Sequence, residues 1–256
     1  MIKLFRKNQQ VTSKKGKTNK SIITTGKPAL PAGRYFKYGI GEVARVMIGI
    51  LLALQVNIWN ENRKINNKEQ TFLKDLKSEL SSNLNALNSV IDEHQKSYEA
   101  AQLLLAYSQK PLELYNIPDS TANYLVNTMN QNWTYNPKKG ILNSIIFSGQ
   151  LTYFKNKELT YLLASIDDVT QDALESTYQI ERDRADLFNP AFKNGFFFKD
   201  GVLAGYNVKG VFQAPEFWIA VKGLFVDQRK VGLDEERRLK KMLEEMLRLI
   251  EGEIKI

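Results

Sequence analysis

The spacing of hydrophobic residues changes near position 60. No charged or amide side chain interrupts residues 46–54, and Tyr38 and Trp59 lie on either side of this run. A helix from Tyr38 to Trp59 rises about 31 Å, close to the hydrocarbon thickness of a bilayer. Aromatic residues at this separation match the two interfacial belts of a spanning helix. The pattern predicts a transmembrane helix over residues 38–60, with interface anchors at Tyr35, Tyr38 and Trp59.

Two charges and two small residues share one face of this predicted span. Glu42 and Arg45 are three positions apart, and Gly49 and Ala53 continue the face at intervals of four. Both charges lie within two turns of one end, where an arginine side chain can reach the interface. The small pair would let another helix approach closely. We hypothesise an association face here; the alternative is that the small residues face lipid.

After Lys68 the apolar residues recur at steps of mostly three and four. No Gly or Pro occurs from Ile50 through Lys110, so nothing forces a break. The spacing predicts a long amphipathic helix or stalk over 61–110. It packs either against the protein's own later helices, which we favour, or against a partner or second copy as a coiled coil. The stripe consists of Leu73, Leu76, Leu80, Leu84, Leu87, Ile91, His94, Tyr98, Ala101 and Leu105.

Residues 111–256 are predicted to form an irregular helical bundle, so the fold class is mainly α. We expect a loop from Pro111 that leads to a short helix with Asp119 or Ser120 as N-cap. A second helix should follow Pro137 and stop at Gly149, and a third should run from Asn156 to about Leu187.

The remainder of the chain is more ambiguous. A short β-hairpin near 195–212 and a helix around 215–225 are equal alternatives, the former because Lys-Asp-Gly is a hairpin-turn sequence. The acidic residues 234–236 suit the start of a C-terminal helix. Its apolar stripe is Leu239, Leu243, Met246 and Ile250.

The net charge of +8 belongs to the N-terminus. Ten Lys or Arg residues and no acid precede Glu42, whereas the other 215 positions carry a net charge of −2. We therefore predict a basic, flexible cytoplasmic arm over 1–37 and, by the positive-inside rule, an extracytoplasmic body. The arm has only Phe5 before Tyr35, which disfavours nucleic-acid binding. No cysteine is present, which excludes disulfides and thiolate chemistry.

Candidate catalytic chemistry is sparse. His94 is the only histidine and is interpreted as a packed helix residue, because its acidic neighbours in sequence do not converge with it on one metal ion. The carboxylates Asp167, Asp168, Glu181, Asp183 and Asp186 read as a solvated helix face. The sequence has no nucleotide-binding, nucleophile-elbow or zinc-protease motif. We predict no catalytic residues, cofactor or metal site, and no enzyme activity.

Three stretches carry a resemblance. They are MIKLFRK, YGIGEVARVMIGILLALQVNIWNENRK and LNSIIFSGQLTYFKNKELTYLLASI. Together they resemble an uncharacterised bacterial family, a domain of unknown function with an N-terminal span of the pattern IGE…GILxALQxNxWNE and a helical remainder. The chain departs from that pattern in its longer arm and in Arg45, where the family has an apolar residue. The resemblance implies a single-span protein of the bacterial inner membrane and supplies no activity.

Two functional hypotheses of different classes follow. The first is a membrane-anchored interaction or structural module whose partners are membrane lipid and either a second copy or another membrane protein. The second is a soluble helical protein with a nucleic-acid-binding arm, and an extracytoplasmic hydrolase is a third, weaker alternative. No small-molecule ligand is indicated.

Overall fold

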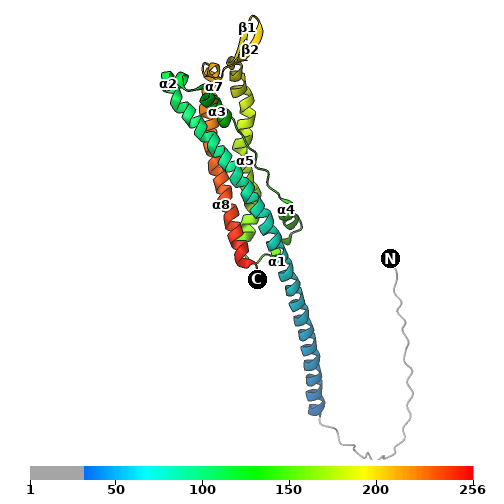
Figure 1. The fold of residues 1–256 in the computed structure, drawn as a ribbon. Coiled ribbons are helices and arrows are strands. Elements are labelled where there is room, and N and C mark those ends of the chain that lie inside the picture. The colour runs from blue at the N-terminus through cyan, green and yellow to red at the C-terminus, as the bar shows by residue number, and fades with distance from the viewer. Residues whose placement is uncertain (1–31, 256) are drawn as a thin grey trace, which may run out of the picture. The chain divides into compact units, whose positions relative to one another are not determined.

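The computed structural model describes residues 32–255 (Figure 1), with side chains from residue 38. The chain divides after Trp59 into two units, which are described separately. Most of the predicted basic arm lies outside the described residues. Helix α1 (Ala32–Ser108) includes 32–37, so this part of the arm was wrongly predicted to be irregular.

The second unit is a mainly α body built on three long helices. The later part of α1 packs with α5 (Lys157–Phe192) and α8 (Arg229–Glu253), which run side by side in Figure 1. Helix α8 is antiparallel to α1: Lys77 pairs with Glu251 at 2.9 Å, and Arg237 bonds Gln95 at 2.7 Å farther along.

Most of the predicted stripe of α1 is buried within the body, whereas Leu84, Tyr98 and Leu105 are only partly buried. Leu73, Leu76, Leu80 and Leu87 are each at most 1% exposed, and the C-terminal stripe from Leu239 to Ile250 is fully buried. Each leucine buried in this way contributes about 1.5–3 kcal/mol. This confirms that the amphipathic helix packs against the protein's own later helices.

Short elements connect the long helices. Asn156 caps α5 as predicted, because its Oδ1 accepts a hydrogen bond of 3.0 Å from the N–H of Leu159. The short connecting elements are α2 (Pro111–Asn116), α3 (Asp119–Met129), α4 (Gly140–Phe147), the 3₁₀ turns η1 (Gln150–Tyr153) and η2 (Lys193–Gly195), α6 (Val208–Val211), α7 (Pro215–Ala220) and the π-helix η3 (Val221–Gln228).

Three local predictions were wrong. Helix α2 replaces the predicted loop, because proline is well suited to the first turn of a helix. Helix α3 begins at Asp119 with Pro118 as its N-cap. Helix α8 begins at Arg229 rather than at residues 234–236, since it continues from α7 through η3 and has no free N-terminus that acidic residues would stabilise.

The β-hairpin exists, and so does the helix from Pro215. Strands β1 (Phe196–Lys199) and β2 (Val202–Tyr206) pair antiparallel around a two-residue turn. Asp200 and Gly201 both have positive φ, 53° and 79°, which is the conformation of a type I′ hairpin turn. The side chains of residues 196–198 are 46–67% exposed, so this phenylalanine cluster is surface.

Candidate functional site

Apolar side chains surround the first unit's helix on every side. From Ile40 to Trp59 every large hydrophobic side chain is between 51% and 64% exposed. A helix that is apolar all round requires an apolar phase to cover it. Within the described part of the chain, α1 is the one helix long and apolar enough to cross a membrane.

The residues predicted to form an association face lie on this exposed segment. Glu42, Arg45, Gly49 and Ala53 are all exposed, and a Cβ built on Gly49 meets nothing within 4 Å. Within residues 38–255, neither Glu42 nor Arg45 forms an ion pair. Tyr38 is 78% and Trp59 63% exposed, whereas the side chain of Tyr35 lies outside the described residues. The face is therefore open to a second helix or to lipid.

A buried polar layer divides the body's interior into two apolar clusters. One cluster lies around α2, α3, α6, α7 and the C-terminal end of α1, and the other around α4, residues 73–91 of α1, the first half of α5 and most of α8. Each long helix passes from one cluster to the other through polar residues. These are His94 and Ser97 between Ile91 and Ala100 in α1, Ser176 and Thr177 between Ala173 and Ile180 in α5, and Arg229 between Phe225 of η3 and Leu233 of α8.

His94 is at the centre of this layer and is fully buried. Its Nε2 accepts a hydrogen bond from the backbone N–H of Trp133 at 3.1 Å, so Nε2 carries no proton. Its Nδ1 is 2.7 Å from Oε1 of Glu236. The neutral imidazole therefore donates its Nδ1–H to the carboxylate, and both ring nitrogens are used.

Arg229 supplies the positive charge of the layer. It is 1% exposed and donates from Nη2 to the backbone O of Gln131 at 3.1 Å and to Oδ1 of Asn132 at 2.8 Å. Burial lowers the pKa of Arg229 to about 10; the Glu236 carboxylate opposes this fall and the cation of Arg184 adds to it. The Nε of Arg229 and the Oε2 of Glu236 are buried without a protein partner, so both charges are imperfectly satisfied.

One face of α1 also holds the connection between α3 and α5. Ser97 donates to the backbone O of Met129 at 2.6 Å, and the Asn83 amide exchanges two bonds of 2.7 and 2.8 Å with the backbone of Lys138. Since contacts with later residues occur at earlier positions of α1, residues 130–139 run antiparallel to that helix. This segment is called the strap below.

Two glutamates extend this face. Glu79 accepts from the backbone N–H groups of Ile141 and Leu142 at 2.8 and 3.0 Å, and thereby caps α4 from a different helix. Glu69, 3% exposed, accepts from the backbone N–H of Lys155 at 2.8 Å. These polar side chains of α1 therefore hold backbone segments of the body in place, which is a structural role.

The carboxylates considered as hydrolase candidates lie apart along α5. Asp167 pairs with Lys139 at 2.8 Å, and Glu181 pairs with Arg184 at 2.7 Å. Across the described residues, no group of three or more His, Asp or Glu side chains is arranged to hold a metal ion. Asp167, Glu181 and Asp183 form surface ion pairs.

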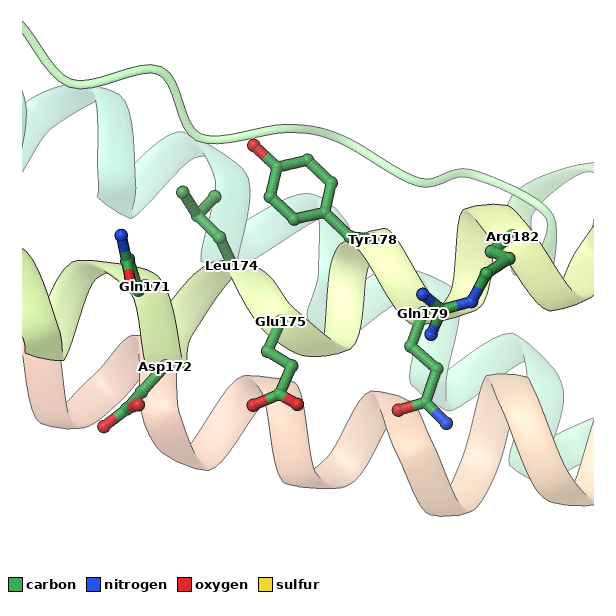
Figure 2. Close-up of a pocket in the computed structure, with 7 residues that line it drawn as sticks. All are labelled: Gln171, Asp172, Leu174, Glu175, Tyr178, Gln179 and Arg182. Carbon is green, nitrogen blue, oxygen red and sulfur yellow. The ribbon is translucent and has the colours of Figure 1, made fainter.

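A groove of about 490 Å³ follows the outer side of α5. Figure 2 shows its seven labelled side chains along that helix, with α8 beside it: Gln171, Asp172, Leu174, Glu175, Tyr178, Gln179 and Arg182. Asp172 pairs with Arg238 at 3.6 Å, and both side chains are more than half exposed. The groove is a solvated polar surface without a nucleophile paired to a base.

Sequence reasoning missed Glu236 and Arg229. Glu236 was assigned to a helix start, although it lies three residues before Leu239 and so occupies the next position of the apolar stripe. The signal available in the sequence was an ionisable residue at a position of an apolar stripe, as with Glu236 in α8 and His94 in α1. Nothing local identified the partner, because His94 and Glu236 are 142 positions apart.

No curated protein and no solved structure matches the chain. A protein-family model matches residues 42–226, which include most of the exposed apolar segment and the body up to η3. This match confirms the resemblance to a domain of unknown function, although it carries no activity. The chain belongs to the family of unknown function DUF6090.

Proposed function

We propose that this protein is a membrane-anchored helical module that acts outside the cytoplasm through interaction or structural support rather than catalysis. Residues 38–59 anchor it in the bacterial cytoplasmic membrane, with the N-terminus inside. The partner at the anchor is lipid, a second copy or another membrane protein.

The observation that carries the proposal is the exposure of apolar side chains around the whole circumference of α1 from Ile40 to Trp59. Burying twelve such side chains in hydrocarbon favours insertion by more than the cost of Glu42 and Arg45 near one end, where charges reach the interface. A soluble protein would leave this surface in water.

The body supports a non-catalytic role. The titratable groups of its polar layer, His94, Glu236 and Arg229, bond to one another, to backbone or to an amide, and do not line the groove of about 490 Å³ on α5. Its polar side chains hold the strap and cap helices, which makes a rigid body suited to presenting a surface. The basic residues before the anchor favour an inside N-terminus.

The test is protease accessibility of a C-terminal tag in intact spheroplasts. We expect the tag to be lost without lysis and the protein to resist alkaline extraction of the membranes. The same tag placed at the N-terminus is the matched control and should be protected until lysis. A protected C-terminal tag on extractable protein would overturn the anchor, and salt-dependent nucleic-acid binding would be tested next.

A further inference from the structure

A pocket of about 520 Å³ lies where α1 enters the body. Its lining comes from the first turns of the second unit and from η1, and all of it belongs to the body: Glu61, Lys64, Ile65, Asn67, Lys68 and Tyr153. This volume falls in the range of small-molecule sites. The lining combines two ammonium groups, an amide and a phenol, which are hydrogen-bond donors for an anion.

Neither Lys64 nor Lys68 forms an ion pair within the described part of the chain. Neighbouring Lys155, by contrast, pairs with Glu69 at 3.2 Å and donates to Asn66 at 2.6 Å. Lys68 lies over the ring of Tyr153, with its Nζ 5.4 Å from the ring centroid. This contact leaves the positive charge of Lys68 without a carboxylate partner, and both residues line the pocket.

Lys64 and Lys68 are close enough on α1 for their positive charges to repel each other, and this repulsion favours binding of an anion between them. Like charges at i and i+4 on a helix repel, and Lys64 and Lys68 have this spacing. An anion between them replaces the repulsion with two attractions. With Glu61 included, the charged residues that line the pocket carry a net charge of +1, which matches a monoanionic group.

The place of the pocket along α1 identifies the anion, given the proposed membrane anchor. Lys64 follows Trp59 by about 7.5 Å of helical rise and Lys68 by about 13.5 Å. Each interfacial layer of a bilayer is about 5–8 Å thick and contains the lipid phosphates. Lys64 therefore lies at phosphate depth, and Lys68 lies within side-chain reach of it.

We propose that this pocket binds the phosphodiester headgroup of an anionic glycerophospholipid from the membrane in which the protein is anchored. Lys64 and Lys68 bind the phosphate, and Glu61 and Asn67 accept hydrogen bonds from headgroup hydroxyls. The bound lipid joins α1 to η1 through Tyr153.

The test measures which lipid surrounds Trp59. The full chain is reconstituted in vesicles of equimolar phosphatidylcholine and phosphatidylglycerol, with bromine on the acyl chains of one lipid or the other. A Trp59→Phe variant gives the background from Trp133 and Trp218. We expect brominated phosphatidylglycerol to quench Trp59 more strongly, with a preference of about ten- to thirtyfold for two lysines near an anionic surface.

Two double variants distinguish lipid binding at the pocket from a general effect of positive charge. K64Q/K68Q should abolish the preference, whereas K199Q/K230Q removes the same charge from exposed lysines of the body and should retain it. Excess inorganic phosphate, compared with chloride at equal ionic strength, should not compete. Competition by phosphate, equal quenching by both lipids, or equal behaviour of the double variants would overturn the inference. Absence of quenching by either lipid would instead refute the anchor.

Discussion

His94 of α1 donates to Glu236 of α8 across 2.7 Å, in a layer that separates the two apolar clusters of the body. The same imidazole accepts from the strap at Trp133. One side chain therefore joins three segments that are far apart in sequence. The Glu236 side chain is only 2% exposed, so its Oε1 depends on His94 for a hydrogen-bond partner.

Replacing His94 with Ala should destabilise the body by about 1–3 kcal/mol, because it leaves the buried Oε1 of Glu236 and the backbone N–H of Trp133 without their hydrogen-bond partner. H94L/E236L should cost less than the sum of the separate changes. Unfolding of the full chain by urea in detergent micelles, followed by circular dichroism, measures both. Asp92→Ala, at an exposed position of the same helix, is the control; equal effects of H94A and D92A would contradict the role of the layer.

Replacing Glu79 with Ala should cost about 1–2 kcal/mol and loosen α4, because Ile141 and Leu142 lose the acceptor of their N–H groups. Hydrogen exchange at those two amides reports the change directly. The exposed Asp75 is removed in the control variant, Asp75→Ala. If both variants left exchange at residues 141 and 142 unchanged, Glu79 would not be the cap.

Gly232 permits α5 and α8 to approach each other. A Cβ at this position would lie 2.8 Å from the Cβ of Ser176, whereas one at Gly252 meets nothing within 4 Å. Both glycines belong to α8, so alanine improves helix propensity at each. Gly232→Ala should nevertheless destabilise by about 1–3 kcal/mol through overpacking, and Gly252→Ala should be neutral or stabilising. Thermal melting compares them, and equal melting temperatures would exclude the close approach.

Tyr135 connects stability to alkaline pH. It is 4% exposed, and burial raises the pKa of its phenol above the ordinary value of 10. The neutral phenol is favoured by the fold, so this stabilisation is complete below pH 10 and is lost as pH rises through the folded-state pKa. Tyr135→Phe should reduce the loss of stability above pH 10. Urea midpoints on both sides of pH 10 test this, and identical pH profiles would contradict it.

The parts of the fold that were predictable rest on local physics. The stripe from Leu73 to Leu105, the Asn156 cap and the Asp200–Gly201 turn follow from periodicity, capping and φ preferences within a few residues. The start of α8 did not follow, because the acidic run at 234–236 resembles a helix start whether or not another helix precedes it.

The polar layer was not predictable for a different reason. The chain shows that His94 occupies a stripe position, but the identity of its partners depends on how α1, α8 and the strap align in space. Arg229 is followed by Lys230 and resembles any surface cation in sequence. The buried guanidinium of Arg229 donates its hydrogen bonds to residues 131 and 132, which lie almost a hundred positions earlier.

Replacing Arg45 with Leu separates the anchor from a soluble alternative. Arginine at the centre of a span costs about 2.5–3.5 kcal/mol on insertion, and less near an end. Arg45→Leu should therefore increase the fraction of newly made chain that resists alkaline extraction from membranes. Arg182→Leu removes the same charge from an exposed position of α5 and should leave that fraction unchanged. Because the two variants lose equal charge and gain equal hydrophobicity, only burial of position 45 in lipid makes them differ; equal extraction would place this segment outside the bilayer.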